Sequence, residues 1–220
     1  MLCEPAPALT DLVLGLVTLG LGWALRSRPD IHRYWRLTYW WSGCAAVAGF
    51  VHHGWVTCSE TWAGPSWAVI SGMVVIAISY LLAATVIEVL GPGRGRVFWV
   101  LRSASLVAYA IVALSGNAGV GAILLCEGIT MLAILALWFG AAARGMPLAR
   151  QVCVALLASG AAAAFRAMPA EWTETVGLDP VSLYHLAQIP GLVLLARALL
   201  GRAPAAAGRP AAYPAPDASA

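Results

Sequence analysis

The chain has 220 residues, of which 61% are hydrophobic and only 10% charged, and its formal net charge is +3. A soluble domain carries about 25% charged residues, so this composition excludes an ordinary soluble domain and indicates a membrane protein. The small and scattered net charge argues against a nucleic-acid-binding protein.

Seven stretches are long and apolar enough to cross a bilayer, which takes about 20 mostly apolar residues. They predict an all-α, polytopic membrane helix bundle with seven transmembrane helices, at about residues 8–25, 34–56, 66–90, 97–114, 120–143, 148–168 and 180–200. The break at residues 115–119 is so short that the fourth and fifth helices are expected to be antiparallel neighbours. Residues 1–200 form the predicted membrane domain. Residues 201–220, rich in Ala and Pro, are predicted to be a disordered cytoplasmic tail.

The first stretch is expected to be a retained helix and not a cleaved signal peptide. The residues before it include Glu4 and no positive charge, whereas a secretory leader begins with basic residues. Asp11 also lies inside the apolar run.

The arginines predict the orientation, because cytoplasmic loops are enriched in basic residues. Those that fall on one side are Arg26, Arg28, Arg33, Arg36, Arg94, Arg96, Arg102, Arg144, Arg150, Arg197, Arg202 and Arg209, and only Arg166 falls on the other. We therefore expect the N-terminus outside and the C-terminus inside, with the protein integral to a bacterial inner (cytoplasmic) membrane.

All thirteen basic residues are arginine, and the chain has no lysine. A retinal-type photoreceptor needs a lysine amine to form its Schiff base. Retinal is therefore excluded as a cofactor of this seven-helix chain.

Ionisable side chains are costly in hydrocarbon, so those inside predicted helices are candidate site residues. Asp11, His52, His53 and His185 map to the outer half of the bundle, and Glu127 lies slightly deeper. Imidazoles and a carboxylate are good zinc ligands, so the three histidines are candidate metal ligands. Either Asp11 or Glu127 is a candidate catalytic base. Adjacent residues of a helix point about 100° apart, so one of His52 and His53 is expected to face the bundle axis.

Three neighbours on the last helix, Ser182, Tyr184 and Gln188, are expected to line the same pocket. Structural roles remain open beside these functional ones. Asp11 could cap the first helix, and an ion pair or hydrogen bond inside the bundle is sufficient to account for Glu127.

Cys3 and Cys58 both fall on the expected outer side, which is oxidising for a bacterial inner membrane. A disulfide between them is compatible with this topology, and so are two free thiols.

Three segments carry a resemblance to known proteins: Thr10-Asp11, residues 49–54 (GFVHHG) and residues 179–188 (DPVSLYHLAQ). Through them the chain resembles a poorly characterised family of bacterial seven-helix membrane proteins. That family is distantly similar to the superfamily of alkaline ceramidases and progestin/adiponectin-type receptors. The resemblance implies zinc held by His52 or His53 together with His185, and hydrolysis of a lipid amide.

The chain departs from the superfamily pattern at two places. Ile189 stands where a second histidine of the last helix is found in the superfamily, and Ala48 and Gly49 stand where a serine precedes the earlier histidine. These departures favour a non-enzymatic protein that binds a lipid or small molecule, acts as a sensor, or is a subunit of a complex. The alternative is a zinc-dependent intramembrane hydrolase of a lipid amide, in which zinc-bound water is the nucleophile. Membrane lipids are the expected partners, and a protein partner or homo-oligomer is left open.

Overall fold

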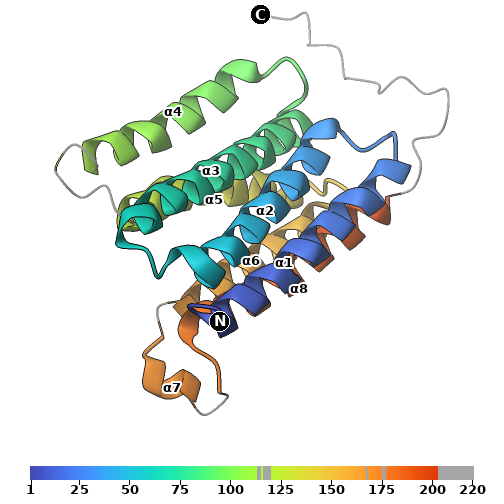
Figure 1. Ribbon diagram of the computed structural model, residues 1–220. Coiled ribbons are helices and arrows are strands. Elements are labelled where there is room, and N and C mark those ends of the chain that lie inside the picture. Colours follow the sequence, from blue (N-terminus) through green and yellow to red (C-terminus); the bar gives the residue numbers. More distant parts are fainter. Residues whose placement is uncertain (113–114, 116–119, 167, 175–176, 203–220) are drawn as a thin grey trace, which may run out of the picture.

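The structure is a computed structural model that describes residues 1–112, 115, 120–166, 168–174 and 177–202. The described chain is all-α (Figure 1). Its α-helices are α1 (Pro5–Ala24), α2 (Arg33–Val51), α3 (Glu60–Leu90), α4 (Gly95–Val112), α5 (Val120–Ala143), α6 (Ala149–Arg166), α7 (Ala170–Glu174) and α8 (Pro180–Leu200). A 3-10 segment, η1 (Leu25–Ser27), extends α1, and a π-helical segment, η2 (His52–Val56), extends α2.

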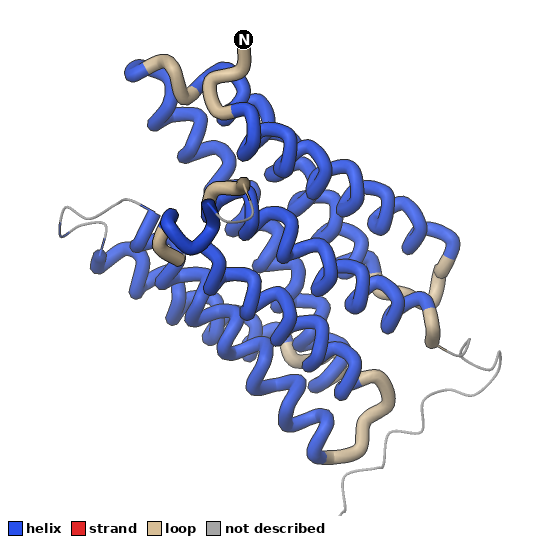
Figure 2. Tube along the Cα trace, turned by 90° about the horizontal axis from the view of Figure 1, so that it is seen from below, coloured by secondary structure: helices blue, strands red, loops and turns tan. Residues whose placement is uncertain are grey.

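Within the described residues, six helices pack into a closed ring. Helix α1 packs on α2 and α8, α2 on α3, α3 on α5, α5 on α6, and α6 on α8. Helix α4 lies outside this ring, against α3 and α5 (Figure 1). Figure 2 shows the long helices running side by side along a common direction, joined by short connections. This is the arrangement of an up-and-down membrane bundle.

Five helical segments are long and apolar enough to cross a membrane: Pro5–Ser27, α3, α4, Ile123–Ala143 and α8. Large apolar side chains are exposed on their surfaces, among them Leu16, Val69, Trp99 and Leu132. Such surfaces suit lipid and not water. The described part of the chain is therefore that of a membrane protein.

Helices α2 and α6 are not among these five segments. Helix α2 begins with Arg33 and Arg36 among aromatic residues, and α6 contains Arg150, Gln151 and Arg166, so both are less apolar. Each is nevertheless a full member of the ring.

The predicted helix positions agree with the observed ones to within a few residues, with two differences. Helix α3 begins at Glu60, six residues earlier than predicted, and continues through Pro65, which lies inside it. The short helix α7 was not predicted. The predicted break at residues 115–119 lies outside the described residues apart from Ser115, and the predicted tail lies outside them from residue 203 onward.

Glycines let α1 and α2 approach each other closely. A Cβ atom at Gly15 would lie 2.8 Å from the Val47 side chain, and one at Gly43 would lie 2.6 Å from Leu19. Small residues at helix contacts are a common device in membranes, where backbone proximity increases van der Waals contact. This contact holds the start of α1 against the end of α2.

The apolar core fills one end of the ring. Trp35 and Tyr39 near the start of α2 pack with Trp138 near the end of α5 and Leu199 near the end of α8, all fully buried. The rings of Trp35 and Trp138 are 6.2 Å apart. The opposite end, formed by the start of α1, the end of α2 and the start of α8, contains His52, His53 and His185.

Charged residues close the core end of the ring. Arg28 pairs with Asp30 at 2.8 Å. It also donates to the carbonyls of Leu200 and Arg202 and so caps the end of α8. Arg202 in turn pairs with Glu88 at 2.7 Å. The hydrogen bond from Arg28 lowers the pKa of Asp30 from its ordinary value.

Candidate metal centre

Three ionisable side chains from different elements meet at the histidine end of the ring. Asp11 lies in the second turn of α1, His53 in η2, and His185 in the second turn of α8. One ligand atom from each lies within 4.8 Å of the others. Asp11 and His185 are 5% and 7% exposed, and His53 is also largely covered. Within the described residues, this group could hold a metal ion.

The Asp11 carboxylate lies between the two imidazoles. Its Oδ1 is 3.4 Å from His185 Nε2, and its Oδ2 is 3.9 Å from His53 Nε2. Both separations exceed the 2.7–2.9 Å typical of a charge-assisted hydrogen bond. Two atoms about 2.0–2.1 Å from a tetrahedral zinc lie about 3.3 Å apart, which is close to the first separation and shorter than the second.

The other nitrogen of each imidazole has a partner that fixes the ring. His53 Nδ1 is 2.5 Å from Glu4 Oε2, and His185 Nδ1 is 3.1 Å from Thr10 Oγ1. Thr10 Oγ1 lies 2.9 Å from the Ala6 carbonyl and 3.0 Å from the Pro7 carbonyl, so its one proton has a backbone acceptor and its lone pairs can accept from His185. Protons on Nδ1 of His185, facing Thr10, and on Nδ1 of His53, facing an ionised Glu4, satisfy both contacts.

This assignment leaves both Nε2 lone pairs directed at the Asp11 carboxylate. Three acceptors then face one another in a buried place, which is unfavourable unless a proton or a metal cation lies between them. Metal-binding histidines characteristically donate their second N–H to a carboxylate or another oxygen, and both histidines have such an oxygen at Nδ1. Asp11, His53 and His185 could therefore hold a metal ion.

The π-helical segment η2 separates the two adjacent histidines. His53 faces Asp11 and His185, whereas His52 Nδ1 lies 3.2 Å from Ser66 Oγ, and its ring is 5.8 Å from that of Trp67 on α3. Short π-helical segments are frequent at functional sites because they change the direction of side chains. The structure thus groups His53, and not His52, with the other two ligands.

Glycine 49 makes room for the carboxylate. A Cβ atom at Gly49 would collide with Asp11, so only glycine lets the end of α2 lie against this part of α1. In the sequence motif GFVHHG, Gly49 therefore provides the space that the Asp11 carboxylate occupies, and His53 provides a candidate ligand.

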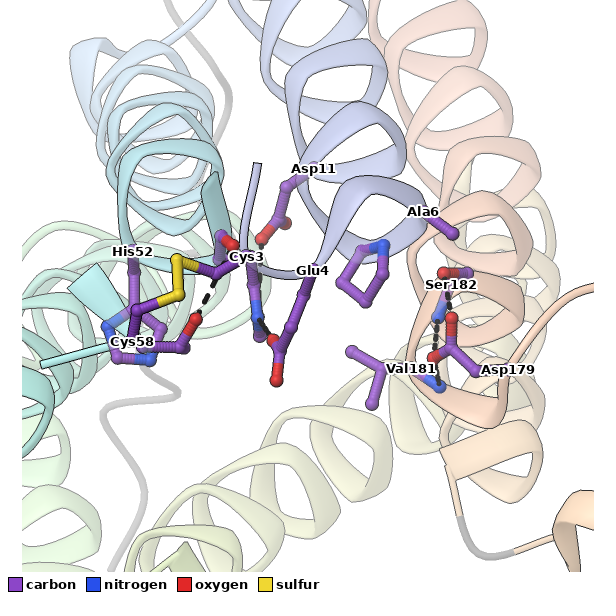
Figure 3. A network of polar contacts seen from close by, with 12 residues as sticks. Cys3, Glu4, Ala6, Asp11, His52, Cys58, Asp179, Val181 and Ser182 are labelled. Carbon is purple, nitrogen blue, oxygen red and sulfur yellow. Dashed lines mark hydrogen bonds and ion pairs between the residues drawn. A yellow bond between two sulfur atoms is a disulfide. The ribbon is translucent and has the colours of Figure 1, made fainter. Parts of the chain in front are cut away.

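The other predicted pocket residues have separate partners. Asp179 caps α8, accepting from the backbone N–H groups of Val181 and Ser182 and from the Ser182 hydroxyl (Figure 3). Burial raises the pKa of Asp179, but these hydrogen bonds outweigh it, and the pKa lies below its ordinary value. The Tyr184 ring is 5.6 Å from the His185 ring, and its side chain interacts with that of Gln188.

Glu127 belongs to a different buried cluster. Its two oxygens lie 3.0 and 3.3 Å from the Arg102 guanidinium, which also donates to Thr130 Oγ1 at 2.7 Å and to the Val75 carbonyl at 3.0 Å. Arg102 lies inside α4 and is 2% exposed, so its charge is buried within this cluster. An ion pair thus accounts for Glu127, which is not grouped with Asp11.

Two residues of the centre were missed from the sequence. Thr10 contacts His185, and Glu4 contacts His53. Neither residue belongs to a recognisable spacing of metal ligands, and Glu4 precedes the first predicted helix. The one available signal was that Thr10 directly precedes Asp11. Cys3, beside Glu4, is joined to Cys58 by a disulfide, and Figure 3 shows this bridge next to Glu4 and Asp11.

The comparisons with known proteins yield one match. The sequence is similar to the model of a family of unknown function (DUF6962) over residues 6–204, which spans the whole ring. No curated protein and no solved structure matches the chain.

Proposed function

We propose that this chain, which belongs to the family of unknown function DUF6962, is a non-enzymatic membrane protein that binds a divalent transition-metal ion, zinc, through Asp11, His53 and His185. The observation that supports this most is the convergence of Asp11 with the two Nε2 atoms while both Nδ1 atoms are occupied. A bound ion would serve sensing or structural stabilisation.

We propose zinc because two histidines with one carboxylate are an established zinc ligand set, in which the fourth tetrahedral position is left open. The same ligand types also hold non-haem iron(II), so both metals are measured in the test below.

We further propose that α2 and α6 span the membrane together with the five more apolar segments, giving seven spans with the N-terminus outside. Two observations support this. The ring cannot close without α2 and α6, and the Cys3–Cys58 disulfide suits an oxidising outer compartment. The metal centre would then lie near the outer face of a bacterial inner membrane.

A hydrolase is the second candidate. Three protein ligands leave the fourth position of a tetrahedral zinc for water, as catalytic zinc sites do. The resemblance to alkaline ceramidases supports a lipid amide as substrate. The covered state of Asp11 and His185 and the location of Glu127 with Arg102 favour the non-enzymatic function.

Metal content tests the proposal directly. We expect protein purified in detergent from cells grown with zinc to contain zinc close to one ion per chain by mass spectrometry, with little iron. His53→Ala, His185→Ala and Asp11→Asn should each lose most of it, because each removes one of only three ligands.

His52→Ala is the matched control, since His52 neighbours His53 but faces Ser66. It should keep its zinc. Wild-type protein that remains metal-free after zinc addition would refute the metal centre, and loss in His52→Ala equal to that in His53→Ala would refute the ligand assignment.

The same preparations separate the two functions. Zinc-loaded wild type incubated with a fluorescent ceramide is expected to release no fatty acid above the level of His185→Ala. Release that depends on zinc and on His185 would replace the non-enzymatic function by the hydrolase.

A further inference from the structure

A short N-terminal segment lies along η2, beside the metal centre. The backbone N–H of Cys3 donates to the Gly54 carbonyl at 2.8 Å, and that of Glu4 donates to the His53 carbonyl at 2.9 Å. Gly54 is buried, and a Cβ atom there would lie 3.3 Å from the Leu2 side chain. We call residues 2–4 the strap. It holds both the backbone and the ring of His53.

The disulfide anchors the strap at its centre. Cys3 and Cys58 have Cα atoms 5.8 Å apart and are 55 residues apart in sequence. Cys58 lies just past the end of η2, so the bridge joins the strap to the same segment that carries His53. Without it, two backbone hydrogen bonds and the contact between Glu4 and His53 would have to hold the strap against η2.

Glu4 connects the strap to metal binding. Its side chain is 47% exposed, yet its carboxylate accepts from His53 Nδ1. An exposed glutamate contributes little on its own, because ordering a long side chain costs entropy and water screens its charge. Fixing the backbone one residue away, at Cys3, removes much of that cost.

We propose that the Cys3–Cys58 disulfide makes metal binding by this centre dependent on redox state, with Glu4 as the positioning residue through which it acts. This inference rests on the proposed metal centre. The oxidised protein binds the ion tightly, and reduction frees the strap, releases Glu4 from His53 and weakens binding. Orienting groups of this type change metal affinity about 10- to 100-fold.

The redox step is ordinary thiol–disulfide exchange with an external dithiol. One thiolate of the dithiol attacks a sulfur of the bridge, which forms a mixed disulfide with one cysteine and releases the other. The second thiol of the dithiol then attacks the mixed disulfide and releases the first cysteine. Two electrons and two protons pass to the protein, leaving Cys3 and Cys58 as thiols and the dithiol as a disulfide. Cys58 is exposed, so a reductant reaches the bridge.

The test is the zinc dissociation constant, measured in detergent by competition with a fluorescent chelator. Cys3→Ser/Cys58→Ser, which contains neither bridge nor extra thiols, should bind zinc about 10- to 100-fold more weakly than the oxidised wild type. Cys44→Ser is the matched control, because Cys44 is a free cysteine, and it should bind like wild type.

Substitutions of Glu4 separate positioning from general stability. Glu4→Ala should weaken zinc binding in the oxidised wild type but add little in the Cys3→Ser/Cys58→Ser background, since both changes break the same link. Glu4→Gln keeps an acceptor for His53 and should lose less than Glu4→Ala. Full additivity of the Glu4 and cysteine changes would overturn the role of Glu4.

The outcomes distinguish this proposal from the metal centre itself. Equal zinc affinity with and without the bridge would overturn the redox dependence while leaving the centre intact, whereas no zinc in the oxidised wild type would refute the centre. Should the double variant not fold, folded wild type is compared before and after reduction with a phosphine. Tighter binding after reduction would show that the freed thiols become ligands, which also overturns the proposal.

Discussion

At the scale of single residues, the contact at Nδ1 of each histidine influences whether its Nε2 atom is free to bind a metal ion. The Thr10 hydroxyl has backbone acceptors in Ala6 and Pro7 and lies 3.1 Å from His185 Nδ1, so it favours a proton on that nitrogen. One hydroxyl thus favours a free Nε2 on His185. A histidine with the opposite tautomer would present an N–H to the ion and could not bind it.

Replacement of Thr10 by valine tests this hydroxyl. The two side chains are similar in size, but valine offers no acceptor to His185. We expect zinc affinity to fall about 10-fold, in the range found for other groups that orient metal ligands. Thr18→Val is the matched control, because Thr18 is equally buried on α1 and bonds only to the Leu14 carbonyl. Equal loss in both variants would contradict the tautomer argument.

At the scale of elements, α4 is attached to the bundle differently from the other long helices. Its buried residues among those described are both polar, Arg102 and Ser105, while Trp99 and Val107 are exposed. Arg102 reaches α5 through Glu127 and Thr130, and α3 through the Val75 carbonyl. This group of polar contacts around Arg102, which we call the polar clasp, holds the helix together with the partly buried side chains of Phe98 and Leu101.

Breaking the clasp on one side should destabilise the protein. Arg102→Ala leaves the Glu127 carboxylate buried without its partner, and loss of one member of a buried ion pair costs about 3–5 kcal/mol. Thermal unfolding in detergent should therefore occur at a markedly lower temperature. Arg102→Met/Glu127→Met removes both charges and should recover much of the loss. A double variant less stable than either single one would count against this explanation.

At the scale of the whole molecule, the ring places its two kinds of interior at opposite ends. Trp35, Trp138 and Leu199 fill one end with apolar packing, and Asp11, His53 and His185 meet at the other. The division follows from the up-and-down order of the helices, which returns the end of α2 and the start of α8 to the start of α1.

Reporter fusions test how this ring is oriented in the membrane. With seven spans, a fluorescent protein fused after residue 220 should fluoresce in bacteria, and alkaline phosphatase at the same place should be inactive. The same two reporters inserted between α2 and α3 should give the reverse. An active phosphatase at the C-terminus would refute the odd number of spans or the predicted direction.

The helices themselves could be predicted from the sequence. A segment in hydrocarbon must form its backbone hydrogen bonds internally, and a long run of apolar residues indicates such a segment. Segments such as 180–200 were located to the residue. The set of ionisable residues worth considering followed from the same physics, since each is costly in a membrane. The candidates Asp11, His53 and His185 were therefore named before any packing was known.

Only the tertiary structure decided which of these candidates lie together. The choice between His52 and His53 depends on a π-helical segment and on how α2 lies against α1, which a regular helix period does not express. The pairing of Glu127 with Arg102 and the role of Glu4 depend on contacts between residues 25 and 49 positions apart. The sequence alone determined that this is a helical membrane protein with ionisable side chains inside its helices, because both properties depend on local composition. Which of these side chains lie together depends on how distant helices pack, and only the tertiary structure shows that.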